Sequence, residues 1–228
     1  MLEGHKNASE RVEFMKLEIG TKVPNHFKES WEGQYEVFSH LEFACGIPQV
    51  LTAITTMKEN GKPNVCFHAW SCFQGDREGY FALLAGMNRN QHTYANIERT
   101  GNFCVNFLSQ EYYDRLMETI KNGKDDDEFA LGDFTIEPSA SISSPRIKES
   151  FLTLECSKEA IHSLTSTGSS ELIIGRVLSI AVEEEYAKGI DRKYGEDGFM
   201  FNVNSPKNCF TGEDDSTGVA TLQVNRRS

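Results

Sequence analysis

The chain has 228 residues, of which 39% are hydrophobic and 25% charged, which is enough for one sizeable core and too few to require two domains. Its formal net charge of -11, from 34 acidic and 23 basic residues, would repel a polyanion, and no local basic stripe offsets it. A nucleic-acid partner is therefore not expected.

No segment of the sequence suggests export or membrane insertion. The first residues, MLEGHKNASERVEF, lack the apolar core of a signal peptide. The longest apolar stretch, 172–182, is interrupted by Arg176 and is shorter than a bilayer requires. The six cysteines include no CxxC pair, which is typical of reduced thiols. We therefore expect a cytoplasmic protein with no membrane partner. Cys66, His68 and Cys72 fall on one face of an expected strand, but no further ligand is clustered nearby in the sequence, so no metal site is expected.

Three strands are expected in the first half of the chain. The β-branched segment 48–57 and the segment 64–72 flank Asn60-Gly61, a pair that favours a type I′ hairpin turn. A glycine-flanked loop at 75–79 then leads to a third strand at 80–85. These strands are predicted to be antiparallel.

Two helices and a strand follow. Asn90 is placed to cap a short helix that Gly101 ends, and His92 and Thr93 fall in its first turn. The segment 102–109 alternates like a strand, and apolar residues from Tyr113 onward recur at helical spacing.

The second half predicts more strands. The acidic run 124–128 is interpreted as a solvated face, and the serine- and proline-rich segment 133–149 as a surface loop. Strands are expected at 151–156, 171–183 and 219–224. In the second of these, four apolar residues are expected to share one side; they are Leu172, Ile174, Leu178 and Ile180.

Many hairpin-linked strands with only two clear helices favour a closed antiparallel barrel, mainly β with helices (α+β). No internal repeat or linker divides the chain. We expect one domain over 1–228, with an N-terminal extension of about 1–40 and a C-terminal segment of about 186–228.

A set of short motifs follows in order along residues 44–110. They are Thr55-Thr56, Asn60-Gly61, Pro63-Asn64, Trp70-Ser71, His92-Thr93, Asn96-Ile97, Thr100-Gly101 and Val105-Asn106. In order and spacing this pattern resembles the flavin-reductase-like family of FMN-binding split barrels, flavoredoxin-type proteins included. Two departures are Gly75-Asp76-Arg77-Glu78, where many members have Asp-Pro-Pro, and Arg89, which is offset from the position of a basic residue just before His-Thr.

The resemblance implies a homodimer that binds FMN and acts as an NAD(P)H-dependent flavin oxidoreductase, with NADH or NADPH as co-substrate. FMN needs donors for its phosphate and a shelf for its flat ring, and a helix start supplies the donors. The expected phosphate end is Asn88, Arg89, Asn90, His92 and Thr93. The expected ring wall is His68, Ala69, Trp70, Ser71 and Cys72. No protein acid, base or nucleophile is expected to be catalytic.

Several alternatives stay open at this point. Trp70 could be plain core, the first turn at His92 could be an ordinary capped helix, and Asn64 and Asn106 could serve backbone groups alone. Neither a GxGxxG nor a Walker motif occurs, so a bound nicotinamide would stack on the flavin. The competing functions are a flavoredoxin-like electron carrier with a protein partner, and a barrel that holds no flavin or another flat ligand such as haem.

Overall fold

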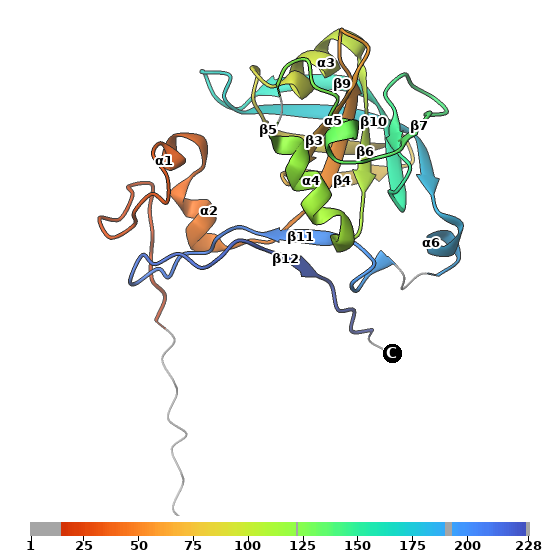
Figure 1. Ribbon diagram of the computed structural model, residues 1–228. Helices are drawn as coiled ribbons and strands as arrows, with labels where there is room; N and C mark the ends of the chain where they lie inside the picture. Colours follow the sequence, from red (N-terminus) through yellow and green to blue (C-terminus); the bar gives the residue numbers. More distant parts are fainter. Residues whose placement is uncertain (1–14, 122, 190–192, 227–228) are drawn as a thin grey trace, which may run out of the picture.

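The structure is a computed structural model that describes residues 15–121, 123–189 and 193–226 (Figure 1). The first 14 residues of the predicted N-terminal extension therefore lie outside the described residues. The strands are β1 (Gln49–Val50), β2 (Thr52–Met57), β3 (Pro63–His68), β4 (Ser71–Asp76), β5 (Gly79–Met87), β6 (Asn102–Phe107), β7 (Ile136–Glu137), β8 (Arg146–Ile147), β9 (Leu152–Ser163), β10 (Glu171–Val182), β11 (Met200–Val203) and β12 (Gly218–Thr221). The helices are α1 (Gln34–Val37), α2 (His40–Cys45), α3 (His92–Thr100), the 3-10 helix η1 (Gln110–Tyr112), α4 (Tyr113–Ile120), α5 (Glu128–Leu131) and α6 (Glu184–Lys188).

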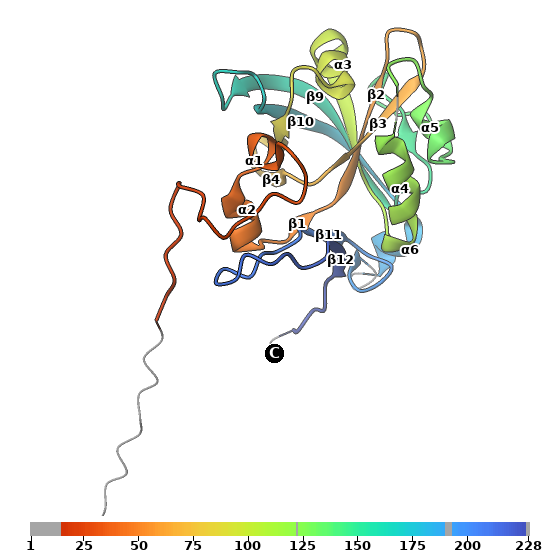
Figure 2. The ribbon, with the colours of Figure 1, turned by 60° about the vertical axis from the view of Figure 1, so that its left-hand side comes forward.

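The main sheet has seven strands in the order β3-β2-β6-β9-β10-β5-β4, and every neighbouring pair is antiparallel. Its two edge strands, β3 and β4, are consecutive in the chain and only Ala69 and Trp70 separate them. Three Cα steps span at most about 11 Å, so the two edges meet at this point. The sheet is therefore curled into a barrel that opens between β3 and β4 (Figure 2).

Two apolar clusters fill the molecule. One packs inside the curled sheet and includes Ile54, Leu84, Phe103 and Ile173, all of them fully buried. The other lies on the opposite face of β2 and β3, where α4 and α5 pack against β3. Since successive residues of a strand point to opposite faces, β2 is buried on both sides and stands at the centre of the structure.

The hairpin between β2 and β3 corrects the expected turn type. A type I′ turn needs positive φ at both central residues, but in this turn only Gly61, with φ 80°, is left-handed. Lys58 C=O accepts from Gly61 N–H, and Lys58 N–H donates to Lys62 C=O. The loop therefore has three residues, 59–61. Asn60 does not adopt the left-handed conformation, and its side-chain oxygen accepts from Lys62 N–H at 3.0 Å.

The expected strand over 64–72 is two strands. Pairing of β3 with β2 ends at His68, and pairing of β4 with β5 begins at Ser71. The turn after β4 is also shorter than the loop expected at 75–79, since β4 runs to Asp76 and β5 begins at Gly79. The break lets one continuous piece of sequence supply both edges of the barrel opening.

The predicted helix after the third strand is α3, and Gly101 ends it in the left-handed conformation with φ 71°. Its N-cap is Gln91, not Asn90, and no side chain caps it. Asn90 instead donates its backbone N–H to Asn88 Oδ1 at 2.9 Å. The loop before α3 is thus closed on itself, and α3 begins one residue later than expected.

Two expectations about the second half were wrong. In the acidic run, Asp125 and Asp126 are exposed, but Glu128 begins α5 and is 1% exposed. In β10 the buried residues are Glu171, Ile173 and Gly175, whereas Leu178 and Ile180 are 50% and 59% exposed. Register shifts between Ile174 and Gly175 and between Val177 and Ser179 break the alternation that the sequence pattern assumed.

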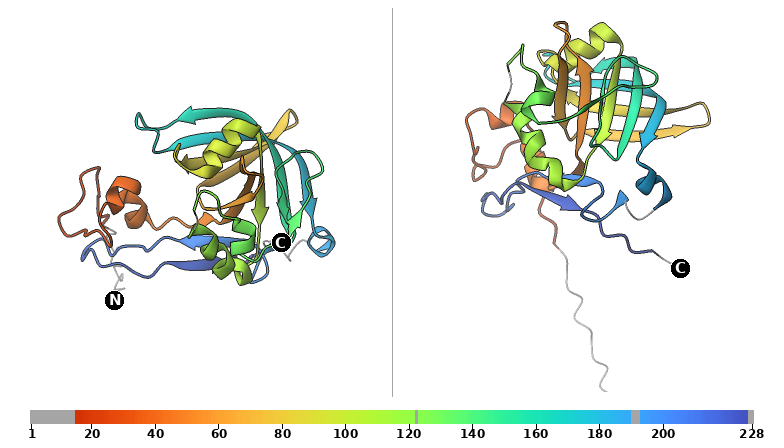
Figure 3. Two further views of the ribbon diagram at one scale, coloured as in Figure 1. Left: turned by 45° about the horizontal axis from the view of Figure 1, so that its top comes forward. Right: turned by 45° about the vertical axis from the view of Figure 1, so that its right-hand side comes forward.

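The two terminal parts of the chain pack next to each other. A small sheet with the order β1-β11-β12 lies beside the barrel opening, and α1 and α2 stand next to it (Figure 3). The buried Lys207 Nζ donates to Lys28 C=O at 2.9 Å and pairs with Asp214. No helix among the described residues is long and apolar enough to cross a membrane.

Candidate functional site

A cavity of about 670 Å³, called here the main cleft, opens along β3 and the start of α3. Its lining comes from β3, the Ala69–Trp70 link, the α3 start, α4, α5 and the terminal segments. The lining residues are Phe38, Leu51, Asn64, Val65, Cys66, Phe67, His68, Ala69, Trp70, Asn90, Gln91, His92, Thr93, Tyr113, Met117, Ile120, Glu128, Asn202, Asn204 and Thr217. Residues as far apart in the sequence as Phe38 and Thr217, which are 179 positions apart, thus line one site.

One end of the main cleft is the start of α3. Asn90, Gln91, His92 and Thr93 line it, and among the described residues the N-cap side chain of Gln91 makes no capping hydrogen bond to the first turn. The N–H groups of that turn carry the positive end of the helix dipole. This end is therefore suited to an anion, and the sequence prediction for Asn90, His92 and Thr93 places them on the cleft.

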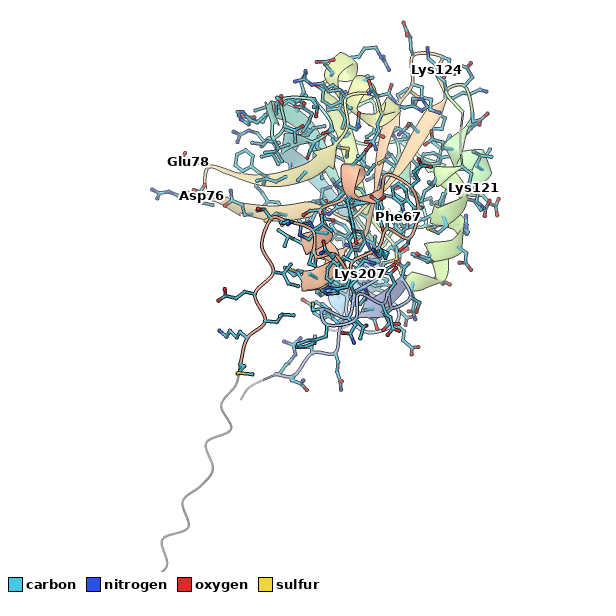
Figure 4. All side chains as sticks on the ribbon, turned by 90° about the vertical axis from the view of Figure 1, so that its left-hand side faces the viewer. Phe67, Asp76, Glu78, Lys121, Lys124 and Lys207 are labelled. Atoms are coloured by element: carbon cyan, nitrogen blue, oxygen red, sulfur yellow. The ribbon has the colours of Figure 1, made fainter. Side chains whose placement is uncertain are left out.

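The other wall is aromatic. The Trp70 ring lies 5.6 Å from the Phe38 ring, centroid to centroid, at an interplanar angle of 36°. Gly86 supports it from behind, since a Cβ on Gly86 would lie 2.8 Å from Trp70 Cε3. Phe67, labelled in Figure 4, adds an edge-on contact with Tyr113 at 5.6 Å. Flat aromatic surfaces of this kind suit a flat ligand ring.

His68 is the last residue of β3 and lies next to this aromatic wall. It is 5% exposed, and its Nε2 lies 3.1 Å from Trp70 C=O. Burial lowers the pKa of His68 to about 4, although the hydrogen bond to Trp70 opposes the shift. His68 is therefore neutral near pH 7 and donates its Nε2–H to the Trp70 carbonyl, which fixes the backbone at the link between β3 and β4.

A buried polar network lies behind the α3 start. Glu128 Oε1 pairs with Lys58 Nζ at 2.8 Å, and Glu128 Oε2 accepts from Val65 N–H at 2.6 Å. His92 Nδ1 lies 4.0 Å from Glu128 Oε1. Burial raises the pKa of the Glu128 carboxyl, and the hydrogen bonds from Lys58 and Val65 oppose that shift.

Asn64 connects this network to α3. Turned so that its Nδ2 faces Glu128 Oε1 at 3.2 Å, its amide oxygen accepts from Thr93 Oγ1 at 2.9 Å. Thr93 is 3% exposed, so its hydroxyl is committed to Asn64. The network therefore holds the first turn of α3 against β3.

Four predicted site residues lie outside the lining of the main cleft. Arg89 Nε pairs with the buried Glu171 at 2.7 Å, and its Nη2 donates to Ser163 Oγ at 2.7 Å, so its guanidinium is held at the β9–β10 turn. Asn88 shapes the loop before α3. Cys72 is exposed on β4, and the buried Ser71 hydroxyl has no hydrogen-bond partner among the described residues. Their role in cofactor binding stays a prediction.

Several lining residues were not predicted. Phe38 belongs to the N-terminal segment and Asn202, Asn204 and Thr217 to the C-terminal one, and no local pattern ties them to the cleft. The burial of Glu128 was not predicted either, because it depends on Lys58 and Val65, which are more than 60 residues away in the sequence.

The structure answers the open question about Asn106. Asn106 is fully buried and its Oδ1 accepts from Ile147 N–H and Thr153 Oγ1, so it serves the strand backbone. Burial raises the pKa of the Cys66 thiol to about 11, so this cysteine is a neutral thiol near pH 7. The described residues hold no cluster of three or more metal-ligating side chains.

The curled antiparallel sheet and its edge cleft define a split barrel. The model of the flavin reductase like domain matches residues 44–196, more than half of the chain, and the chain therefore belongs to that family. The predicted resemblance and the predicted antiparallel, mainly β fold are both confirmed.

Among proteins of similar sequence, a protein from Methanothermobacter thermautotrophicus is 26% identical over 141 residues, which cover 61% of this chain and 66% of that one. The reductase subunit HsaB of a flavin-dependent monooxygenase from Rhodococcus jostii is 33% identical over 98 residues. That match covers 42% of this chain and 46% of HsaB, so it spans less than half of the relative's length.

Two solved structures have a similar fold. A protein with a split barrel domain from Shewanella frigidimarina superposes with a TM-score of 0.68 at 18% identity, covering 87% of this chain and 93% of that one. A flavoredoxin from Methanosarcina acetivorans gives a TM-score of 0.67 at 16% identity, covering 94% and 95%. At these identities the likeness concerns the fold.

Proposed function

We propose that this chain is a flavoprotein that binds FMN in the main cleft and transfers electrons from NADH or NADPH to flavin. The observation that carries the proposal is the uncapped first turn of α3, which opens onto a cleft whose other wall is Trp70 and Phe38. The Gln91 N–H already donates to Asn88 C=O at 3.0 Å, so the FMN phosphate would take the N–H groups of His92 and Thr93. The ring would lie along the aromatic wall.

The residues present fit this cofactor in size and chemistry. The cleft volume of about 670 Å³ is in the usual range for a small-molecule site. When bound, the flavin supplies the redox chemistry. The protein residues bind and orient it: His68 fixes the backbone that carries Trp70, and the network of Lys58, Glu128 and Asn64 fixes the α3 start.

The proposal includes a cytoplasmic homodimer formed by one domain per chain. All six cysteines are free, in keeping with a reducing compartment. Membership of the flavin reductase like family, together with the partial match to a monooxygenase reductase subunit, supports the proposed reductase activity.

The decisive experiment combines a spectrum with kinetics. We expect the purified protein to show flavin absorbance, or to take up one FMN per chain on titration, and to oxidise NADH or NADPH when FMN is added. If neither nicotinamide is turned over while FMN binds tightly, the reductase proposal fails.

That second outcome would favour the other candidate, a flavoredoxin-like electron carrier. Two observations support this candidate: the fold match to a flavoredoxin, and the Phe38 ring against Trp70, which covers part of the wall that a nicotinamide would approach. If FMN is not taken up at all, flavin binding in this cleft is wrong, and a spectrum with other bands would identify a different flat ligand.

A further inference from the structure

Glu128 is a buried carboxylate next to the first turn of α3. It is 1% exposed, and three groups fix its position: Val65 N–H at 2.6 Å, Lys58 Nζ at 2.8 Å and, in the amide orientation described above, Asn64 Nδ2 at 3.2 Å. Burying an ion pair is costly, and apolar side chains of similar volume often stabilise a fold as well. The place of this charge beside the main cleft therefore suggests a role beyond stability.

His92 is the neighbour of Glu128 that reaches the main cleft. Its Nδ1 lies 4.0 Å from Glu128 Oε1, and its side chain is 34% exposed. That separation is longer than a hydrogen bond, but a small turn of the partly exposed imidazole would close it. Because a partner at one ring nitrogen determines the role of the other, Nδ1–H on Glu128 leaves Nε2 to a ligand in the main cleft, which His92 lines.

The protein charges around His92 balance one another. His92 lines the main cleft and also a second cavity of about 460 Å³ between α3, the β2–β3 turn and the loop before α5. The charged side chains that line these two cavities are three cations and three anions: Lys58, Arg99, Lys124, Glu59, Asp125 and Glu128. A dianionic phosphate at the start of α3 would therefore be the dominant charge that acts on the imidazole.

The other titratable side chains of the main cleft are neutral near pH 7. Burial lowers the pKa of His68 to about 4 and raises the pKa of the Cys66 thiol to about 11. Burial also raises the pKa of the Tyr113 hydroxyl above its ordinary value. A phosphate monoester is mostly dianionic above pH 7, since its second pKa is about 6. A proton taken up on binding between pH 7 and pH 8.5 therefore points to His92.

We propose that Glu128 is a positioning residue for the flavin phosphate and acts through His92. The carboxylate accepts from Nδ1–H and thereby presents Nε2–H to the phosphate, and His92 takes up a proton as the phosphate binds. This inference rests on the proposed function, in which the phosphate lies at the N–H groups of His92 and Thr93. The imidazolium then lies between two anions and donates a charged hydrogen bond to each.

The first test counts protons. Calorimetric titration with FMN at pH 7.5, repeated in buffers of different ionisation enthalpy, should show an uptake of at least about 0.3 proton per FMN bound. FMN affinity should accordingly fall about threefold between pH 7 and pH 8.5. Riboflavin, which has the same ring and no phosphate, should bind without proton uptake. His92→Gln should abolish the uptake that accompanies FMN.

The second test separates positioning from a structural role. Glu128→Gln alone would leave Lys58 buried without its partner, so the test uses Lys58→Met with Glu128→Gln, which removes both charges at similar volume. This double variant should take up less than about 0.1 proton per FMN and lose the pH dependence of FMN affinity. A matched control, Arg146→Met with Glu155→Gln, removes an ion pair with another buried carboxylate outside the two cavities and should keep both effects.

Each other outcome has a definite meaning. If FMN binds without proton uptake, or if His92→Gln keeps the uptake, the inference fails and the proposed function stands. If the double variant weakens FMN binding by the same factor at every pH and keeps the uptake, the role of Glu128 is structural and the inference is wrong. If neither FMN nor riboflavin binds to the parent protein, the proposed function itself fails.

A measurement on the parent protein decides the matter if the double variant does not fold. Nitrogen NMR of the histidine rings, with FMN bound at pH 7.5, should show a proton on both ring nitrogens of His92. An unprotonated Nδ1 would overturn the role of Glu128.

Discussion

His92 and Thr93 occupy the same helical turn but have different environments. The His92 side chain is 34% exposed and lines both cavities, whereas the Thr93 hydroxyl is bonded to Asn64. Replacing both by alanine removes a donor from the proposed phosphate end and releases the first turn of α3 from β3. At the residue scale, the α3 start is therefore the most direct place to test flavin binding.

We expect His92→Ala with Thr93→Ala to weaken FMN binding by about 1.5 to 3 kcal/mol, the usual worth of a hydrogen bond to a charged group. A fluorescence titration measures it. His26→Ala with Thr100→Ala changes the same residue types outside the cleft and should leave the affinity unaltered. Unchanged FMN affinity in the first variant would contradict the phosphate assignment.

His68 gives the protein a predictable response to acid. Its pKa is about 4 in the folded state because it is buried, against 6.5 for the free side chain. Between these values the unfolded chain takes up a proton that the folded chain does not, so stability is complete above pH 6.5 and falls as the pH drops toward 4. The loss is about 3 kcal/mol, since one pKa unit corresponds to about 1.4 kcal/mol.

Urea unfolding at pH 7 and pH 4.5 measures this loss. Carboxyl groups contribute as well, so the comparison is with His68→Gln, which keeps a donor for Trp70 C=O but does not titrate. The variant should lose about 2 to 3 kcal/mol less than the parent over the same pH range. Parallel losses in the two proteins would mean that His68 titrates normally.

At the scale of elements, Gly86 determines how β5 supports the aromatic wall. It has φ 71°, and an added Cβ would lie 2.8 Å from Trp70 Cε3. Gly61 is a matched comparison, because its φ is 80° and nothing lies within 4 Å of an added Cβ. Alanine at either position has the left-handed backbone cost of about 1 to 2 kcal/mol.

We expect Gly86→Ala to destabilise the fold by at least about 1 kcal/mol more than Gly61→Ala, because only the first adds a steric collision. Displacing Trp70 should also weaken flavin binding in Gly86→Ala alone. Thermal unfolding and FMN titration of the two variants check both points. Equal effects would show that Trp70 adjusts freely and does not depend on Gly86.

Local sequence patterns predicted some of the helices and strands but not others. Strand β6 and helices α3 and α4 were predictable, since each has its own periodicity and Gly101 marks the end of α3. The break at Ala69–Trp70 was not, because it depends on which strand each half pairs with. Phe38 reaches the cleft by packing on Trp70, a contact between segments that no short pattern encodes.

At the scale of the whole molecule, β5 and β10 leave apolar side chains exposed. Tyr80, Leu178 and Ile180 are 44%, 50% and 59% exposed. Tyr80 and Leu154 line an apolar groove of about 260 Å³, and Ile180 stands opposite Leu154 in the strand register. Exposed apolar side chains on two paired strands are typical of an interface between protein chains. It is the surface that we expect the proposed homodimer to bury.

Light scattering on the purified protein should therefore give twice the chain mass of 25.7 kDa. Ile180→Lys places a charge on this surface and should shift the mass toward that of one chain, whereas Leu164→Lys, at a position 56% exposed near the β9–β10 turn, should not. Because both positions are already solvent-exposed, neither variant should unfold. A single-chain mass for the parent protein would refute the homodimer, and a dimer that persists in Ile180→Lys would place its interface elsewhere.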